Sequence, residues 1–122
     1  MSLGGVIAMR GATVRIRRAV QTQGADGATQ RTWRDAPTRR ATMLLEELSA
    51  EKAQRLWGIE TVARFRATLE AEADVRKYDG VIVEDGRFVG LHLRVEEDPR
   101  GSELGPQLTL LGLALTKETF GL

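Results

Sequence analysis

The chain has 122 residues, which is enough for one domain with its own core, and we expect a single domain over residues 1–122. It contains no cysteine, which excludes disulfides, thiolate metal sites and cysteine nucleophiles, and synthesis in the cytoplasm is expected. The longest apolar run, residues 108–115, is too short to cross a bilayer, so no membrane partner is predicted.

The formal net charge of +1 hides an uneven distribution of charge. Residues 1–40 contain eight arginines and two aspartates, a net charge of +6, so the remaining chain carries −5. Such an asymmetry suits either binding to an anionic polymer or association between copies of the same chain. Charge alone does not choose between these two possibilities.

The first predicted element is a half-buried strand over residues 12–20. Val14 and Ile16 alternate with Arg15 and Arg17, so the two arginines are expected on the outward face. Residues 21–28 are polar and contain two glycines, which indicates a loop or an extended hairpin tip.

Two further strands are predicted around Pro37. The alternation resumes over residues 29–35, with Trp33 on the same face as Arg31 and Arg34 on the other. Pro37 is expected to interrupt the pattern, because proline cannot donate to a sheet ladder. Residues 39–46 then place alternate side chains on one face, namely Arg39, Ala41, Met43 and Leu45.

Residues 47–58 form the best helix candidate. Ser49 is a suitable N-cap, Glu51 lies in the first turn, and Gly58 stands where a left-handed cap would end the helix. The apolar face is formed by Ala53, Leu56 and Trp57.

The second half of the chain is predicted to be mostly strand. Residues 61–71 alternate clearly, with Ala63, Phe65, Ala67, Leu69 and Ala71 inward. Residues 80–95 suggest a hairpin with a two-residue turn at Asp85-Gly86 and an inward row of Val89, Leu91, Leu93 and Val95. Residues 96–107 are expected to be an exposed loop, and residues 108–116 a strand covered on both faces.

These elements predict a mainly β fold with one short α-helix. Several short strands and one brief helix favour a small antiparallel β-barrel or sandwich, with the helix inserted between strands and the barrel spanning residues 12–116.

No residue pattern indicates an enzyme. The only histidine is His92, and Ser49 is better explained as a helix cap, so no nucleophile with an activating base is predicted. The acidic group Glu96, Glu97, Asp98 and Glu103 lacks the spacing of a calcium loop, so no metal site is predicted. The glycine-containing segments lack the residues of a phosphate loop, and no cofactor is expected.

Rows of arginines are the main functional candidates. Arg15 and Arg17 share a face of one strand, Arg31 and Arg34 belong to the next, and Arg64 and Arg66 line the outer face of a third. Such rows could contact phosphate, with Trp33 or Trp57 available for stacking. Outward strand faces are polar in any case, however, and both tryptophans are more readily explained as core residues.

The order of these elements resembles that of the head–tail joining proteins of tailed bacteriophages, also called head-closure or stopper proteins. The resemblance extends over most of residues 12–115, and it rests on the order of weak motifs rather than on any one of them. The matching residues are Val14, Ile16, Arg17, Asp26, Gly27, Trp33, Ala41, Ser49, Glu51, Arg64, Arg66, Gly86, Arg87, Phe88 and Val95.

The resemblance implies a structural protein of the virion neck, made in the host cytoplasm. Such a protein forms a homo-oligomeric ring, a hexamer or dodecamer, between the portal or adaptor and the tail. It closes the channel after packaging, docks the tail and contacts packaged DNA non-specifically. The candidate channel, DNA or subunit contacts are Arg15, Arg17, Arg31, Arg34, Arg39, Arg40, Arg64 and Arg66.

The candidate gate and helix segment consists of Glu46, Glu47, Ser49, Glu51, Lys52, Arg55 and Trp57. Residues 21–30, 44–60 and 96–107 are candidates for gate, neighbour and tail contacts, without one role assigned to each. Two alternatives stay open: a free-standing small basic β-barrel that binds nucleic acid non-specifically, and another neck or tail-completion subunit.

Overall fold

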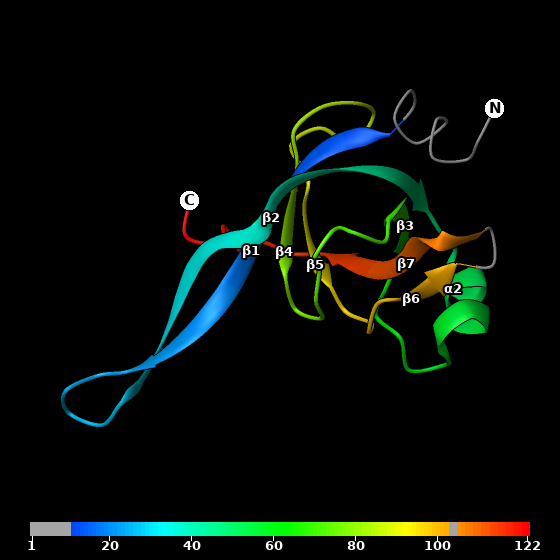
Figure 1. Cartoon of the computed structure of the whole chain (residues 1–122). Coiled ribbons are helices and arrows are strands. Elements are labelled where there is room, and N and C mark those ends of the chain that lie inside the picture. The colour runs from blue at the N-terminus through cyan, green and yellow to red at the C-terminus, as the bar shows by residue number, and fades with distance from the viewer. Residues whose placement is uncertain (1–10, 103–104) are drawn as a thin grey trace.

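The computed structural model describes residues 11–102 and 105–122, and within them the chain forms seven strands and one helix. The elements are β1 (Ala12–Gln23), β2 (Thr29–Glu47), α2 (Ala50–Trp57), β3 (Phe65–Glu70), β4 (Gly80–Val83), β5 (His92–Val95), β6 (Arg100–Ser102) and β7 (Gly105–Leu115) (Figure 1). The prediction of a mainly β fold with one short helix between strands is confirmed.

The strands form one antiparallel sheet whose hydrogen bonds close into a ring. The order is β3-β2-β1-β4-β5-β7-β6, and β3 also pairs with β7. The closing register runs from Phe65↔Leu113 to Glu70↔Leu108. Because β7 also pairs with β5 and β6, the last long strand joins three others and fixes the closure.

The core fills the inside of this ring with alternate side chains. The inward row predicted for β3 is confirmed, since Phe65, Ala67 and Leu69 are buried and pack with Leu111 and Leu113 of β7. The remaining strands contribute residues that are at most 1% exposed: Val14, Ile16, Met43, Val81, Val83, Leu93 and Val95. Ala71, predicted to continue the β3 row, is exposed because β3 ends at Glu70.

Pro37 lies in a bulge and does not divide the strand, so the prediction of two separate strands around it was wrong. Arg15 pairs with Arg40 and Arg17 pairs with Asp35, so residues 36–39 lie opposite Ile16 alone. A bulge leaves its extra residues outside the ladder, where the missing amide of proline costs no sheet hydrogen bond. β2 therefore continues as one strand of 19 residues.

The two long strands extend beyond the closed sheet as a hairpin, whose residues 20–32 we call the arm (Figure 1). β4 pairs with β1 only over residues 14–17, and β3 pairs with β2 only over residues 44–47. In the described part of the chain, the arm strands therefore pair only with each other. The predicted hairpin tip is confirmed, with a turn closed by the Gly24 amide donating to the Ala28 carbonyl at 2.7 Å.

Helix α2 begins and ends as predicted. The Ser49 hydroxyl accepts from the Lys52 amide, and Gly58 ends the helix at a φ of 105°. Trp57 packs on the backbone of β7, where a Cβ on Gly112 would lie 3.0 Å from its ring. The helix thus covers part of the outer face of β7, but Leu115 at the far end is 60% exposed, so the predicted two-sided cover is incomplete. Among the described residues, no helix has the length and apolar character to cross a membrane.

The connection between β4 and β5 is longer than the predicted two-residue turn. It spans residues 84–91, because the Asp85 carboxylate accepts the Thr13 amide of β1 at 2.7 Å and draws the loop toward that strand. Phe88 packs on the core with its ring 5.5 Å from that of Phe65, whereas Val89 is 59% exposed. The prediction that Val89 belongs to the inward row was therefore wrong.

The segment 96–107 is also not entirely a loop. Arg100 and Gly101 pair with Leu110 and Thr109, which makes β6 a short strand beside β7. Residues 103 and 104 lie outside the described residues.

The C-terminal segment fills a site that the sequence analysis did not identify. Phe120 is fully buried, and its ring lies 5.0 Å from that of Trp33. Its carbonyl accepts from Arg17 Nε at 3.1 Å. A Cβ on Gly80 would lie 2.5 Å from the Phe120 ring, so β4 must carry glycine at this position.

We expect Gly80→Ala to destabilise the protein by about 1–3 kcal/mol, because the added methyl group overlaps the buried ring of Phe120 and forces it to move. Urea unfolding at neutral pH measures the change. Gly101→Ala is the matched control, since a Cβ there meets nothing within 4 Å. Equal stability of the two variants would contradict this packing.

Candidate functional site

Three of the candidate arginines converge on one carboxylate, that of Asp35. Arg15 Nε and Arg17 Nη1 lie 2.9 and 3.0 Å from Asp35 Oδ1, and Arg39 Nε lies 3.3 Å from Oδ2. The bulge makes this possible, because it changes the register between Arg15 and Arg17 and brings both side chains to Asp35. These arginines therefore form an internal cluster rather than a free outward row.

The cluster keeps Asp35 ionised. Hydrogen bonds from Arg15 and then Arg17 lower the pKa of Asp35 from 3.8 to about 2. Its negative charge is thus present throughout the physiological pH range and offsets part of the repulsion among the three guanidinium groups.

Arg18, which was not among the candidate residues, forms with Asp79 the most buried ion pair of the described residues. Its Nη2 lies 2.9 Å from Asp79 Oδ2 and 3.3 Å from Asp74 Oδ1, and the side chains of Arg18 and Asp79 are 11% and 3% exposed. The hydrogen bond with Asp79 raises the pKa of Arg18, although burial opposes this. The pair ties β1 to the segment before β4.

The other candidate arginines of the sheet are also engaged within the chain. Arg40 pairs with Glu84 at 2.8 Å, and Arg66 pairs with Glu46, which also binds Lys52 at 3.0 Å. Burial raises the pKa of Glu46, but hydrogen bonds from Arg66 and Lys52 outweigh it and lower the pKa overall. Arg64 donates to the carbonyls of Thr61 and Ala63.

Within the described chain, the two candidate arginines in or next to the arm lack the acid partners that most of the others have. Arg31 and Arg34 are exposed, and neither has an ion pair with any residue that the structure describes. The Arg31 guanidinium lies 4.9 Å from the centre of the Trp33 ring. Trp33 is half-buried and packs with Phe120 outside the main core cluster, so it is part of a small aromatic cluster of its own.

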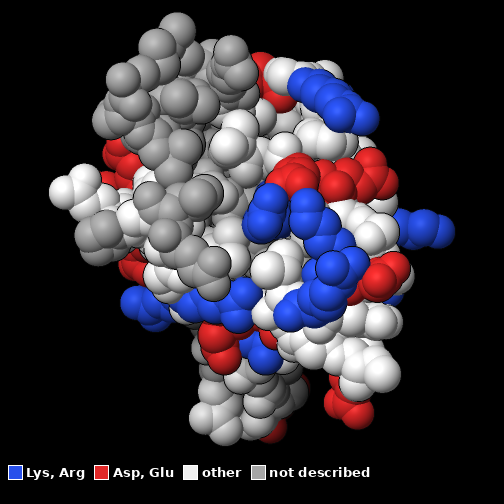
Figure 2. Space-filling model, turned by 90° about the vertical axis from the view of Figure 1, so that its right-hand side faces the viewer, with Lys and Arg blue, Asp and Glu red and all other residues white. Residues whose placement is uncertain are grey.

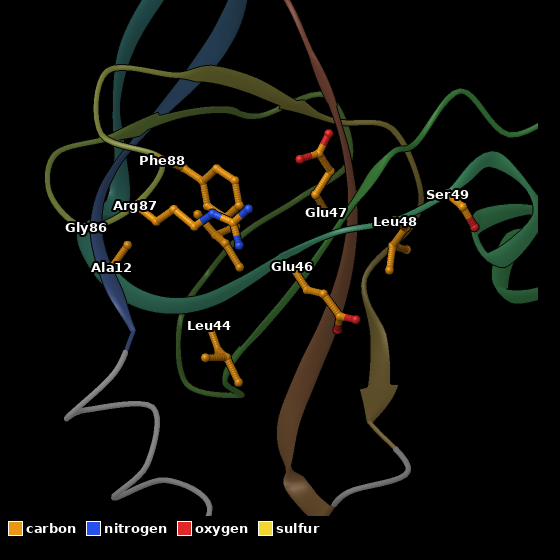
Figure 3. Close-up of a pocket in the computed structure, with 10 residues that line it drawn as sticks. Ala12, Leu44, Glu46, Glu47, Leu48, Ser49, Gly86, Arg87 and Phe88 are labelled. Carbon is orange, nitrogen blue, oxygen red and sulfur yellow. The ribbon is translucent and has the colours of Figure 1, made fainter.

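The candidate gate segment borders a hollow of about 530 Å³ (Figure 3). Glu46, Glu47 and Ser49 line one side, and Arg87 and Phe88 reach in from the loop between β4 and β5. The structure thus brings together two motifs of the resemblance that are far apart in sequence.

The helical part of the gate segment is largely occupied by its own contacts. Glu51 pairs with Arg55 at 3.1 Å, and Lys52 binds Glu46. One side of Trp57 contacts Gly112. The guanidinium of Arg100 lies 5.9 Å from the centre of the Trp57 ring. Trp57 Nε1 is buried and has no hydrogen-bond partner among the described residues. Trp57 thus packs as part of the apolar face of the helix, as predicted, but it is half-buried and lies outside the main core cluster.

On the face that carries α2 and β6, the described side chains of opposite charge are mixed. Figure 2 shows lysine and arginine side chains beside aspartate and glutamate side chains across that face. This mixture follows from the ion pairs Glu51–Arg55, Glu46–Lys52 and Glu46–Arg66, each of which places a cation next to an acid.

His92 and Ser49, the other side chains considered for catalysis, are both used in structural contacts. His92 Nδ1 lies 2.8 Å from the Glu118 carbonyl oxygen, and its ring is stacked on Phe120 at 5.7 Å. The Ser49 hydroxyl is used as the helix cap. Within residues 11–102 and 105–122, no group of three or more histidine or acidic side chains could hold a metal ion, and Glu103 lies outside them.

Comparisons with known proteins identify a fold relative. No protein-family model matches the chain, and no curated protein matches it. The solution structure of protein SF1141 from Shigella flexneri 2a superposes with a TM-score of 0.69 at 18% identity, over 98% of this chain and 99% of that chain. At this identity the likeness concerns the fold.

Four important residues were not predicted from the sequence: Asp35, Asp79, Tyr78 and Phe120. The roles of Asp35 and Asp79 could not be predicted, because the sheet brings each of them to arginines of β1 that are distant in sequence. Tyr78 is the only tyrosine of the chain and is 51% exposed with a positive φ of 74°. Its position between two basic residues and an acid, in the segment "RKYD", is the signal that could have identified it.

We expect Arg18→Met to destabilise the fold on the order of 3 kcal/mol, because it leaves the buried Asp79 carboxylate without its cation. Thermal and urea unfolding measure the loss. Arg40→Met is the control, since it breaks a more exposed pair with Glu84 and should change stability little. Similar losses in both variants would contradict a special role for the buried pair.

The Asp35 cluster predicts a pH dependence of stability. The folded pKa of about 2 lies below the ordinary 3.8, so the stabilisation is full above pH 4 and is lost as the pH falls toward 2. Asp35→Asn should be less stable than the parent at pH 6, and the difference should shrink between pH 4 and 2. Urea midpoints across this range test it, with the exposed Asp98→Asn as control. A difference independent of pH would refute the assignment.

Proposed function

We propose that the chain is a structural subunit of the neck of a tailed phage, a prophage or a phage-derived particle. It forms a ring between the portal or adaptor and the tail, closes the DNA channel after packaging and docks the tail. The observation that carries this proposal is the arm, a two-stranded hairpin that extends from a closed sheet (Figure 1).

The arm is better suited to a partner than to solvent. A two-stranded ribbon has little stability of its own, and its outer edges present unpaired backbone groups that can bind another chain. Residues 21–23 and 29–32 are exposed on these strands. In a cyclic ring, each subunit can place such an element on its neighbour. The ring closes when the rotation between neighbouring subunits adds up to a full turn.

Exposed apolar side chains support a contact surface elsewhere on the subunit. Ile59 and Val62 follow the helix and are 81% and 58% exposed, and Leu115 at the end of β7 is 60% exposed. Ile59 lies within the candidate region 44–60, and Val62 follows it closely. Burial of such side chains between subunits is a driving force that does not depend on charge.

The charge distribution favours a ring subunit over a free-standing nucleic-acid binder. Five of the eight candidate arginines are held by acids of the same chain, at Asp35, Glu84 and Glu46. A protein that binds phosphate through those arginines would need to break these pairs. Another neck or tail-completion subunit would also form a ring, but it would bind to a different partner.

The proposal predicts that the protein adds a ring to a portal–adaptor assembly. The purified chain is mixed with cognate portal and adaptor proteins, and mass photometry and negative-stain microscopy follow the product. An additional ring of density and mass is expected. Addition only to a tail tube would identify the alternative tail-completion subunit, and no addition to either assembly would refute the ring proposal.

A shortened arm tests the structural basis of the same prediction. Replacing residues 23–29 by Asn-Gly keeps the cross-strand pair Thr22↔Gln30 and closes it with a two-residue turn. The variant should unfold like the parent but lose ring addition. Glu72→Gln, an exposed change in the connection between β3 and β4, is the control and should retain it.

A further inference from the structure

A basic surface lies around Tyr78 and includes one of the candidate arginines, Arg31. A hollow of about 540 Å³ is lined by Arg31 of the arm, by the turn residues Arg76, Lys77 and Tyr78, and by Arg94 of β5. We call these five residues the Tyr78 patch. Its members come from three segments that only the fold brings together.

Tyr78 lies in a strained turn that several hydrogen bonds hold in place. Tyr78 has a φ of 74°, which is uncommon for an aromatic residue and costs conformational energy. It is held there because its amide donates to the Val95 carbonyl at 2.7 Å and the Asp79 amide donates to the Arg76 carbonyl at 3.1 Å. The Asp79 carboxylate also accepts the Arg76 amide at 2.9 Å. The fold therefore maintains an exposed aromatic ring at a fixed position.

The patch keeps a positive charge after its internal ion pairs are counted. Arg94 pairs with Glu96, Arg76 with Asp74, and the adjacent Arg18 with Asp79. Arg31 and Lys77 have no carboxylate partner within the described chain and lie instead against Trp33 and Tyr78, at 4.9 and 5.1 Å from the ring centres. Two cations thus remain available to an anionic ligand.

We propose that the Tyr78 patch binds the phosphate backbone of duplex DNA. Phosphate contacts require cations and hydrogen-bond donors without a fixed base sequence, which the free Arg31 and Lys77 and the Tyr78 hydroxyl provide. The turn amides of Tyr78 and Asp79 are already used inside the protein, so they cannot cradle a small free phosphate. Side chains spread over three segments suit a polymer better.

This inference rests on the proposed function for its biological setting, because packaged DNA is the polymer that a neck ring encloses. It also changes which residues are expected to meet that DNA. The arginines held at Asp35 stay with their acid, and Lys77 and Arg31 take the phosphate contacts.

The test is a fluorescence-anisotropy titration of a labelled 20-base-pair duplex with the full chain, between 25 and 200 mM salt. A slope of log affinity against log salt of about −2 is expected for two phosphate contacts. Arg31→Glu with Lys77→Glu should weaken binding at least about tenfold at the lowest salt. Arg55→Glu with Arg87→Glu changes the net charge equally at exposed sites outside the patch and should have a much smaller effect.

Tyr78→Asn separates a binding role from a structural one. Asparagine accepts a positive φ more readily than tyrosine, so the unfolding midpoint should be maintained or raised while duplex affinity falls. An affinity equal to that of the parent would remove Tyr78 from the site. Equal loss of affinity in the two double variants, or no binding at 25 mM salt, would overturn the whole proposal.

The ring assay distinguishes this failure from failure of the proposed function. Lys77→Glu, a change in the patch but outside the arm, should still add a ring to the portal–adaptor assembly. Ring addition by the parent without patch-dependent duplex binding would refute the DNA site alone. Duplex binding through the patch without ring addition would leave the site in place and refute the ring proposal.

Discussion

The ion pairs of the Asp35 carboxylate hold together the part of the fold where three arginines meet. The bulge around Pro37 brings three guanidinium groups to this carboxylate, and without a nearby negative charge their mutual repulsion would oppose the pairing of β1 with β2. Arg17 extends the cluster by donating to the carbonyl of Phe120. One acid therefore connects the bulge, the long hairpin and the C-terminal segment that packs against β4.

Charge pairing also joins the two halves of the chain. The first 40 residues are strongly basic and the rest is acidic, and the fold brings them into contact at Arg18–Asp79 and Arg40–Glu84. The asymmetry that suggested an anionic partner is thus partly satisfied within one molecule. A cation that already binds a buried acid gains less from an external phosphate, because the new contact must replace the old one. The surface cations without such partners matter more for function.

The sequence predicts local structure better than it predicts partners. The β3 row and the Ser49 cap follow from periodicity and capping chemistry, which depend on near neighbours in the chain, and both are confirmed. The turn at Asp85-Gly86 was wrongly predicted because its aspartate binds the amide of Thr13, 72 residues away. The site of Phe120 escaped prediction for the same reason, since the space that it fills is created by a glycine on β4. Most candidate arginines lie on strands as predicted, although Arg64 precedes β3. Their acid partners could not be assigned without the register shift in the sheet.

The closed sheet and the extended arm offer different kinds of surface to a partner. The closed ring of hydrogen bonds fixes the body, so the body offers few backbone groups to a partner, whereas the arm offers two unpaired edges. Backbone edges suit protein neighbours, because they supply complementary amide and carbonyl groups, and free cations suit phosphate. Arg31 lies where these surfaces meet: it belongs to the arm, yet it faces the hollow beside Tyr78. If the arm docks on a neighbouring subunit, that docking would also fix the position of Arg31, so ring assembly and the geometry of the DNA contact would be coupled through one residue.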